Sequence, residues 1–375
     1  MKQYDVVVVG GGLAGLTAAI DLRLSGHSVL VVEKKPYPHH KVCGEYVSNE
    51  IRPYLKSLGV DLRKFGAIDI TNLLMSTKDG DTASTKLPLG GLGISRYTFD
   101  SILYDRALSL GADFIFQVVQ SISFQNDEFK VVTDKKEVHT AKITIGAYGK
   151  RSGLDKTLKR DFIQQKSSWL GVKAHYRYNS FPNNLVALHN FKGGYGGLSR
   201  TESGVVNFCY LANYESFQKF RNISDFNSQV VAKNPYLATF LEKATPVFRE
   251  PMTIAQISFE PKKASEGHVL MCGDTAGLIH PLCGNGMAMA IHGAKLASDL
   301  IHRYFENERY QRTELESDYQ DVWNKTFRQR LWVGRKAQSI LMNETLSKVA
   351  IATAVKSPRL LRSLIERTHG KPIEL

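Results

Sequence analysis

The first 33 residues alternate between apolar runs and a glycine turn. Four consecutive valines, Val6–Val9, predict a strand that is buried on both faces. Residues 13–24 are apolar and alanine-rich, which favours a helix, and residues 28–32 form a second apolar run that ends at Glu33. A strand, a helix and a further strand in this order predict a βαβ unit at the start of the chain.

Beyond this unit, the apolar pattern predicts an α/β region, a strand-rich region and a helical end. We expect strands within residues 67–88, 114–122, 129–133, 141–145, 170–178, 185–189, 205–211 and 253–259. We expect helices at 95–110, within 214–243 and at 287–304, and then amphipathic helix that is interrupted near residues 357–358. A glycine-rich segment, residues 193–197, separates two of the expected strands and belongs to neither.

Gly10, Gly12 and Gly15 stand at the G-x-G-x-x-G spacing of a dinucleotide-binding turn. The first glycine permits a tight turn, the second lets the backbone approach a pyrophosphate, and the third lets the helix pack closely on the strand. The helix N-terminus offers free N–H groups to the phosphates. Glu33, eighteen residues after Gly15, is placed to bind ribose hydroxyls. The pattern predicts a dinucleotide site and leaves NAD and FAD open.

Composition excludes some classes of protein. With 43% hydrophobic and 23% charged residues, the 375-residue chain is typical of a globular enzyme. No apolar run approaches the roughly 18 residues of a membrane-spanning helix. The four cysteines are scattered without a C-x-x-C pair, so we expect neither disulfides nor a metal site. The same use of cysteine predicts a cytoplasmic protein.

The net charge of +13 is concentrated at the end of the chain. Residues 322–375 contain eleven Lys or Arg and three acidic residues, a difference of eight. Either this is an ordinary solvated helix surface, or it docks on an anionic membrane, a nucleic acid or an acidic protein. Aromatic residues do not alternate with these basic residues as they do in proteins that bind single-stranded nucleic acid. We therefore expect no nucleic acid as a partner, and contact with a membrane stays open.

Two later glycine segments resemble a known family. Residues 146–152 read G-A-Y-G-K-R-S, and residues 273–286 read G-D-T-A-G-L-I-H-P-L-C-G-N-G. With the opening glycines, in this order and spacing, they resemble the FAD-dependent superfamily of aromatic-type flavoprotein monooxygenases, flavin halogenases and geranylgeranyl reductases. The resemblance covers about residues 4–305 and implies FAD rather than NAD at the opening site.

The resemblance implies an α/β fold, with a discontinuous Rossmann-like FAD-binding domain, an inserted and mainly antiparallel β-sheet substrate domain, and a C-terminal helical segment. The expected domains are residues 1–75, 97–165 and 260–305 for FAD, residues 76–96 and 166–259 for substrate, and residues 306–375 for the C-terminal helices.

The same resemblance implies a set of FAD-binding residues. Arg96 matches an arginine near the pyrophosphate, and Asp274 matches the aspartate that binds the ribityl chain. Where a helix opens at Met287, backbone N–H groups would favour the negative charge of reduced flavin. The full expected set is Gly10, Gly12, Leu13, Ala14, Gly15, Glu33, Lys34, Lys41, Cys43, Arg96, Gly149, Gly273, Asp274, Pro281, Gly284, Asn285, Gly286 and Met287.

The chain departs from the family pattern in two places. Tyr148 replaces the usual aspartate of a G-A-D-G segment, so the electron donor is expected to be either NAD(P)H or a separate reductase. Tyr195 begins Y-G-G-L-S, where geranylgeranyl reductases carry Y-x-W-x-F-P, and the W-x-W-x-I-P motif of halogenases is absent. The candidate catalytic residues are Cys43, His280 and Tyr195; for Cys43 and His280 a structural role in the core is the alternative.

Three functions stay open. The leading hypothesis is a monooxygenase that hydroxylates an aromatic or electron-rich apolar substrate, through reaction of reduced flavin with oxygen at C4a. A tryptophan side chain of a partner protein is one such substrate. The second is an ene-reductase that saturates prenyl chains, which the Lys41-x-Cys43-Gly44 segment favours by resemblance. The third is a basic flavin-binding protein that docks on membrane or nucleic acid without turnover.

Overall fold

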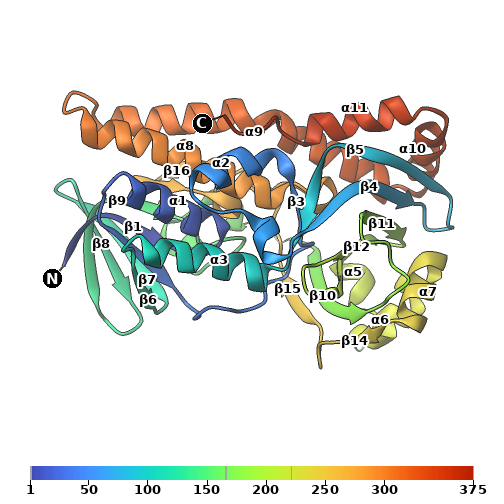
Figure 1. The fold of residues 1–375 in the computed structure, drawn as a ribbon. Helices are drawn as coiled ribbons and strands as arrows, with labels where there is room; N and C mark the ends of the chain where they lie inside the picture. Colours follow the sequence, from blue (N-terminus) through green and yellow to red (C-terminus); the bar gives the residue numbers. More distant parts are fainter. Residues whose placement is uncertain (1, 165–166, 221, 375) are drawn as a thin grey trace.

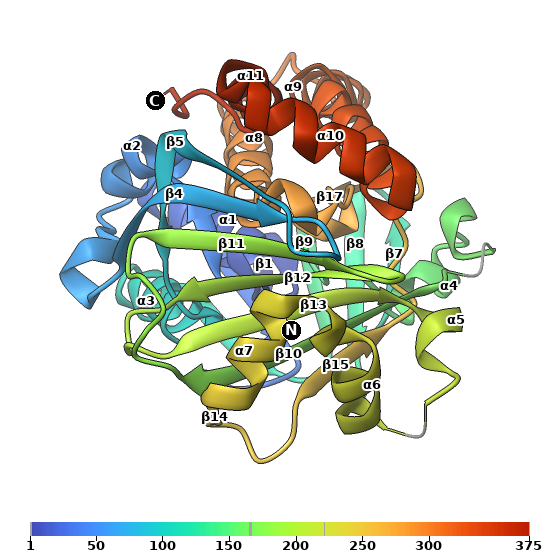
Figure 2. The same cartoon turned by 90° about the vertical axis from the view of Figure 1, so that its right-hand side faces the viewer.

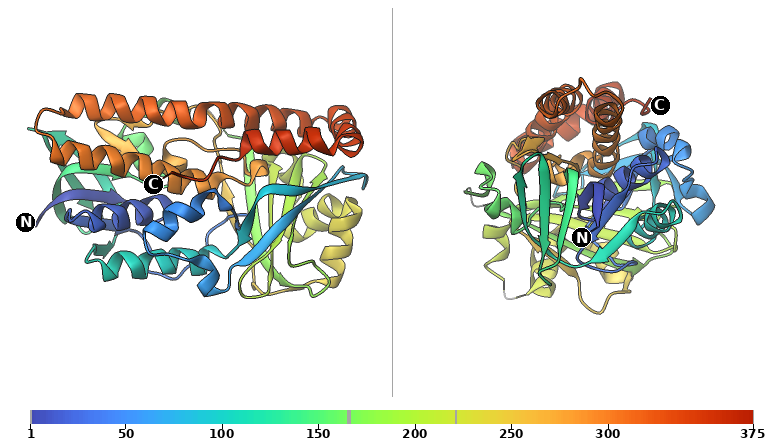
Figure 3. Two further views of the ribbon diagram at one scale, coloured as in Figure 1. Left: turned by 45° about the horizontal axis from the view of Figure 1, so that its top comes forward. Right: turned by 90° about the vertical axis from the view of Figure 1, so that its left-hand side faces the viewer.

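The computed structural model describes residues 2–164, 167–220 and 222–374. Two β-sheets lie at opposite ends of an elongated molecule (Figure 1), and long helices run over both of them (Figure 3). The predicted α/β fold is confirmed. Residues 1, 165, 166 and 375, at which predicted domain boundaries fall, lie outside the described residues.

The first sheet is built on the valines of β1 (Gln3–Val9), which are buried as a central parallel strand requires. Its order is β16-β17-β9-β1-β2-β6, and β8 joins β7 to β9. Strands β17, β9, β1, β2 and β6 run parallel. The other bounds are β2 Val29–Glu33, β6 Asp113–Phe116, β7 Val119–Gln125, β8 Glu128–Thr133, β9 Val138–Gly146, β16 Ser265–Glu266 and β17 Val269–Met271.

The second sheet has nine strands and is mainly antiparallel. Its order is β14-β10-β13-β12-β11-β4-β5-β3, with β15 also paired to β10, and β11 and β4 are parallel. The bounds are β3 Tyr46–Ser48, β4 Ile68–Ser76, β5 Thr82–Gly93, β10 Trp169–Arg177, β11 Leu185–Phe191, β12 Gly194–Arg200, β13 Val206–Asn213, β14 Thr245–Pro246 and β15 Met252–Ala255.

The helices cover both sheets. Helix α1 packs against α3 and α8 beside the first sheet, whereas α10 and α11 pack on β5 at the edge of the second (Figure 2). No helix among the described residues is long and apolar enough to cross a membrane. The bounds are α1 Leu13–Leu24, α2 Arg52–Ser57, α3 Arg96–Ser109, α4 Leu154–Thr157, α5 Tyr214–Phe217, α6 Ile223–Gln229, α7 Pro235–Lys243, α8 Gly286–Glu306, α9 Arg312–Met342, α10 Glu344–Lys356 and α11 Pro358–Thr368.

The glycine-rich segment at residues 193–197 forms most of strand β12, which the sequence pattern did not predict. Glycine is depleted in strands because it loses more entropy and has no side chain to pack. Here β12 pairs with both β11 and β13. A Cβ on Gly196 would lie 2.6 Å from the Phe208 ring, so neighbouring side chains already occupy that space.

Strand β3 and all of β4 except its last residue, Ser76, precede residue 76 but pair in the second sheet. The segment before residue 76 therefore supplies strands to both sheets, although it was expected to belong to the FAD-binding part. The remaining division of the chain into domains stays a prediction.

Candidate functional site

The turn between β1 and α1 needs two of its three motif glycines for packing. Gly10 has a φ of +107°, and a Cβ at this position would lie 2.4 Å from the carbonyl oxygen of Ala147. A Cβ on Gly15 would lie 2.0 Å from the carbonyl oxygen of Gly10. These glycines let the N-terminal end of α1 lie directly against the end of the sheet.

Gly12 is different, because it faces open space beside two cations. A Cβ there would meet nothing closer than Arg96 Nη2 at 3.7 Å and Lys41 Nζ at 4.0 Å. Gly12 lines a cavity and is the N-cap of α1, whose first N–H groups are free to bind an anion. The arrangement fits a pyrophosphate.

Arg96 and Lys41 share one buried carboxylate. The Arg96 guanidinium donates to both oxygens of Asp100, at 2.6 and 2.8 Å, and Lys41 Nζ lies 2.8 Å from Asp100 Oδ2. Burial opposes ionisation of Asp100, but the two cations outweigh it and hold its pKa below the ordinary value. Two positive charges against one negative leave a net positive site next to Gly12.

Glu33 ends β2 at the wall of the same cavity. Its Oε2 accepts a hydrogen bond from the Gly11 N–H at 2.7 Å, and its Oε1 accepts one from the Lys34 N–H at 2.9 Å. Oε1 also accepts a longer hydrogen bond from the Lys35 N–H at 3.3 Å, so Oε2 is the oxygen that keeps a further lone pair for a ribose hydroxyl. The bond from Gly11 holds the Glu33 carboxylate beside the glycine turn, and its contact with a ribose stays a prediction.

The segment at residues 273–286 borders the cavity from the other side. Asp274 lies in a 3₁₀ helix (Gly273–Thr275), and Gly149 donates its N–H to Thr275 Oγ1 at 2.8 Å. This bond joins two of the glycine segments recognised in the sequence. Lys262, which no motif indicated, donates from Nζ to the carbonyl oxygen of Asp274 at 2.8 Å, and burial lowers its pKa to about 8.

Most of the predicted FAD-binding residues line one cavity of about 730 Å³. Gly10, Gly15 and Asn285 do not line it. Asn285 is buried and donates from Nδ2 to the carbonyl oxygen of Thr368 at 3.0 Å, so it holds the end of α11. The predicted residues that do line the cavity are Gly12, Leu13, Ala14, Glu33, Lys34, Lys41, Cys43, Arg96, Gly149, Gly273, Asp274, Pro281, Gly284, Gly286 and Met287.

The three candidate catalytic residues differ in exposure to this cavity. Cys43 and Tyr195 line it, and Cys43 is half-buried. His280 does not line it and packs against Trp169 and Phe259. His280 Nδ1 lies 3.5 Å from the Tyr195 hydroxyl. Burial lowers the pKa of His280 to about 3, so its imidazole is neutral near pH 7 and cannot act there as a cationic proton donor.

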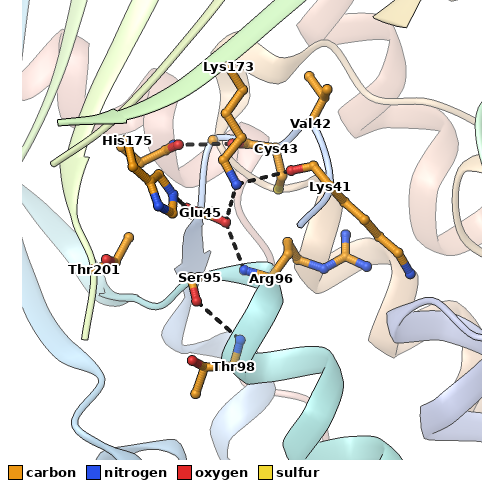
Figure 4. A network of polar contacts seen from close by, with 12 residues as sticks. Lys41, Val42, Cys43, Glu45, Ser95, Arg96, Thr98, Lys173, His175 and Thr201 are labelled. Carbon is orange, nitrogen blue, oxygen red and sulfur yellow. Dashed lines mark hydrogen bonds and ion pairs between the residues drawn. The ribbon is translucent and has the colours of Figure 1, made fainter. Parts of the chain in front are cut away.

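A buried ionic network beside Cys43 is a feature that sequence reasoning missed (Figure 4). Glu45 is fully buried in a left-handed conformation with a φ of 55°. Its carboxylate accepts hydrogen bonds from Lys173 Nζ and the Arg96 N–H, and lies 2.6 Å from His175 Nε2. Burial opposes its ionisation, but Lys173 and His175 hold the pKa of Glu45 below its ordinary value.

The carbonyl groups of residues 41–45 each have a hydrogen-bond donor. Lys173 Nζ donates to the Lys41 oxygen at 3.1 Å, and Lys150 Nζ donates to the Val42 oxygen at 3.4 Å. The other three donors are Asn207 Nδ2 to Cys43, Ser199 Oγ to Gly44 and the Ile94 N–H to Glu45. A segment without regular secondary structure is thus held in one position, mostly by the second sheet.

His40, Glu45 and His175 also lie close enough for their ligand atoms to approach a single metal ion. The Glu45 carboxylate is already paired with the ammonium of Lys173, whose side chain is fully buried. A divalent cation would add two positive charges beside this ammonium in a buried place, which is unfavourable. We therefore interpret the cluster as a structural ion-pair network.

The cavity has a charged end and an aliphatic end. Among the side chains that the structure describes, the Lys, Arg, Asp and Glu of the cavity wall lie near the glycine turn and the two later glycine segments: Glu33, Lys34, Lys35, Lys41, Arg96, Lys150, Arg151 and Asp274. The other end lies between the second sheet and α9–α11. Its wall is formed by Leu73, Met75, Leu87, Val186, Leu188, Ala337, Ile340, Ala350, Leu361 and Ile365.

A model of the FAD-binding domain family matches residues 3–314, most of the chain. The chain belongs to this family. It is a flavoprotein of the FAD-dependent oxidoreductase superfamily, and the resemblance seen in the glycine segments is confirmed. The open backbone at Gly12, the cations beside it and the carboxylates of Glu33 and Asp274 fit this cofactor.

Similar proteins carry names of different activities. Conditioned medium factor receptor 1 of Dictyostelium discoideum is 26% identical, covering 86% of this chain and 68% of the relative. Digeranylgeranylglycerophospholipid reductase 1 of Methanosphaera stadtmanae is 25% identical, and the match covers 87% of this chain and 82% of the relative. The structure of PqsL, a probable FAD-dependent monooxygenase from Pseudomonas aeruginosa, is similar with a TM-score of 0.74 at 14% identity, covering 92% of this chain and 98% of PqsL, which shows a shared fold.

Two glycine substitutions should separate cofactor binding from folding. Gly12→Ala places a methyl group in open space, so we expect a folded protein with weaker FAD binding. Gly15→Ala forces a clash with the Gly10 carbonyl, so we expect a lower melting temperature of the apoprotein. Calorimetry of the apoproteins and titration with FAD would measure both effects. Equal FAD affinity of Gly12→Ala and wild type would contradict the assignment of Gly12.

Lys173→Met should lower the free energy of unfolding by about 3–5 kcal/mol, because it leaves a buried carboxylate without its ammonium partner. The matched control is Lys173→Met/Glu45→Gln, which also removes the negative charge of Glu45 and should recover part of the lost free energy of unfolding. Urea denaturation at neutral pH measures both. Equal destabilisation of the single and double variants would show that the charge on Glu45 is not what Lys173 compensates.

The same network predicts a pH dependence. Because folding lowers the pKa of Glu45, its contribution to stability is present above the ordinary value of 4.5 and is lost as the pH falls through the lower value of the folded state. Wild type should therefore lose stability more steeply than the double variant as the pH falls from 4.5 toward the lower value of the folded state. Parallel profiles from urea denaturation across this range would refute the expectation.

Proposed function

We propose that this flavoprotein is a monooxygenase that inserts one oxygen atom into an elongated, largely apolar and electron-rich substrate. The observation that carries the proposal is the continuous cavity, with predicted FAD-binding residues at one end and aliphatic side chains at the other. Its volume of about 730 Å³ lies in the range of small-molecule and cofactor sites. The charged end suits the cofactor, and the aliphatic end suits the substrate.

The protein's own groups position the reactants and exclude water. Gly12, Arg96 and Lys41 would bind the pyrophosphate, and Glu33 and Asp274 would bind the sugar hydroxyls. Bound FAD supplies the redox chemistry. Helix α8 begins at Gly286 in the cavity wall, where its N–H groups and positive dipole favour negative charge. The aliphatic end would hold the substrate's apolar part away from water.

Two thiols of the cavity wall and one neighbouring imidazole are poorly suited to protonate carbon, which supports oxygen insertion over reduction of a double bond. Saturating a carbon–carbon bond requires two electrons and delivery of a proton to carbon, and efficient donors have a pKa near the working pH. Burial raises the pKa of both Cys209 and Cys283 to about 12. Neighbouring His280 has a pKa of about 3. Insertion of oxygen by a flavin relies more on placement of the substrate and exclusion of water.

Reduction of a prenyl chain is the second candidate, supported by one specific observation. Cys43 lines the cavity, and its backbone carbonyl is held by Asn207, so its thiol is a positioned group beside the expected flavin site. The relative named digeranylgeranylglycerophospholipid reductase has a matching size and 25% identity. In this reaction two electrons and two protons would be added across a double bond, and Cys43 would donate one proton.

The electron donor is part of the proposal. Tyr148 lines the cavity where the family pattern carries an aspartate, and its hydroxyl lies 3.6 Å from Met271 Sδ. NAD(P)H or a separate reductase would supply two electrons for each oxygen atom inserted, the second oxygen atom leaving as water. Bleaching of the FAD spectrum by NADPH alone under nitrogen would identify NAD(P)H as the electron donor.

Product mass distinguishes the two reactions. Chemically reduced protein is mixed with a long-chain alkylphenol under isotopically labelled O₂, and with geranylgeraniol under nitrogen. We expect the phenol to gain the mass of one oxygen atom, derived from labelled O₂, and cresol to react more slowly because it leaves the aliphatic end empty. Gain of two hydrogens by geranylgeraniol, lost in Cys43→Ala, would establish reduction instead. Purified protein that binds no FAD would overturn both proposed reactions.

A further inference from the structure

Helices α9 and α10, which are joined at Asn343, each expose a pair of large apolar side chains. Trp332, Ile340, Leu346 and Val349 are large apolar side chains with 55%, 40%, 49% and 59% of their surface exposed. Trp332 and Ile340 are eight residues apart on α9, and Leu346 and Val349 are three apart on α10, so each pair lies on one side of its helix. We call these four residues the α9–α10 face.

Basic side chains accompany this face. Lys336 lies one turn from Trp332 on α9, and its Nζ is 5.9 Å from the centre of the Trp332 ring. Lys348, between Leu346 and Val349 on α10, is ion-paired with Asp79 at 2.7 Å. Across residues 322–375 the excess of eight positive charges gives this end of the chain a positive field. Apolar groups and cations together suit a surface that is both apolar and anionic.

The aliphatic end of the cavity reaches the surface at the same helices. Ile340 belongs to the α9–α10 face and also lines the cavity. Thr353, one turn beyond Val349 on α10, is exposed and lines the cavity as well. An apolar molecule that enters beside α10 would therefore pass directly into the part of the cavity whose described side chains carry no charge.

We infer that the α9–α10 face docks on the surface of a bilayer rich in anionic phospholipids, and that the cavity opens toward that bilayer. Tryptophan and aliphatic side chains enter the interfacial layer, and lysines remain at the headgroups. No described helix crosses a membrane, so the contact is peripheral. The docking goes beyond the proposed reaction, because it concerns where the protein acts and holds for either product.

Vesicle binding of the full-length, FAD-loaded protein tests this inference. We expect binding to phosphatidylcholine vesicles that contain phosphatidylglycerol, much weaker binding to phosphatidylcholine alone, and weakening as salt rises. Leu346→Glu/Val349→Glu should reduce binding by about tenfold or more, since two inserting side chains become anionic. The matched control is Leu24→Glu/Leu108→Glu, at side chains 46% and 49% exposed on α1 and α3, which should bind like wild type.

Several results would overturn the inference. These are absence of vesicle binding by wild type, equal binding by the face variant and wild type, or an equal loss in the control variant. Binding to duplex DNA or polyglutamate that the face variant abolishes, without vesicle binding, would assign the face to another partner. The visible FAD spectrum of each variant shows that it is folded. Turnover is not measured, so a wrong reaction assignment leaves the vesicle result standing.

Discussion

The buried carboxylate of Glu45 is the group on which the relation between the two sheets depends. It lies between Lys173 and His175 of β10, in the second sheet, and the backbone N–H of Arg96, whose guanidinium faces the glycine turn of the first. A buried charge is tolerated only while it stays paired. A shift of one half against the other would unpair it, so the network fixes how the second sheet meets Arg96 and the glycine turn.

The short segment at residues 41–45 thereby separates two environments. Lys41 at its start faces Asp100 and the glycine turn, in a region where the net charge is positive. Cys43 in its middle faces the cavity, and the Glu45 charge at its end is withdrawn into its own network. With the described ionic groups at one end of the cavity, the other end can be apolar and dry. In such a region the field of the cofactor is weakly screened.

Local signals were enough to predict the cofactor end from the sequence. Gly10, Gly15 and Glu33 belong to one βαβ unit, and their spacing directly reflects a packing requirement that the structure satisfies. The Glu45 network has no such signal, because Lys173 lies 128 residues away and only the sheet brings the two together. Strand β12 was missed for the same reason, since its pairing partners, not its own residues, make it a strand. His280 matched a motif, but burial among aromatic rings decides its protonation.

The C-terminal helices carry no recognised motif, yet their position follows from contacts to the cofactor half. Asn285 donates to the carbonyl oxygen of Thr368 at the end of α11. Arg330 of α9 lies 3.4 Å from the buried Glu50 carboxylate, and the Ile373 N–H donates to the Glu50 carbonyl oxygen. The turn expected beside the flavin therefore holds the helices that wall the aliphatic end. Displacement of α11 would break the Asn285 bond and move Leu361 and Ile365 of the aliphatic wall, so the two ends of the cavity depend on the same helix.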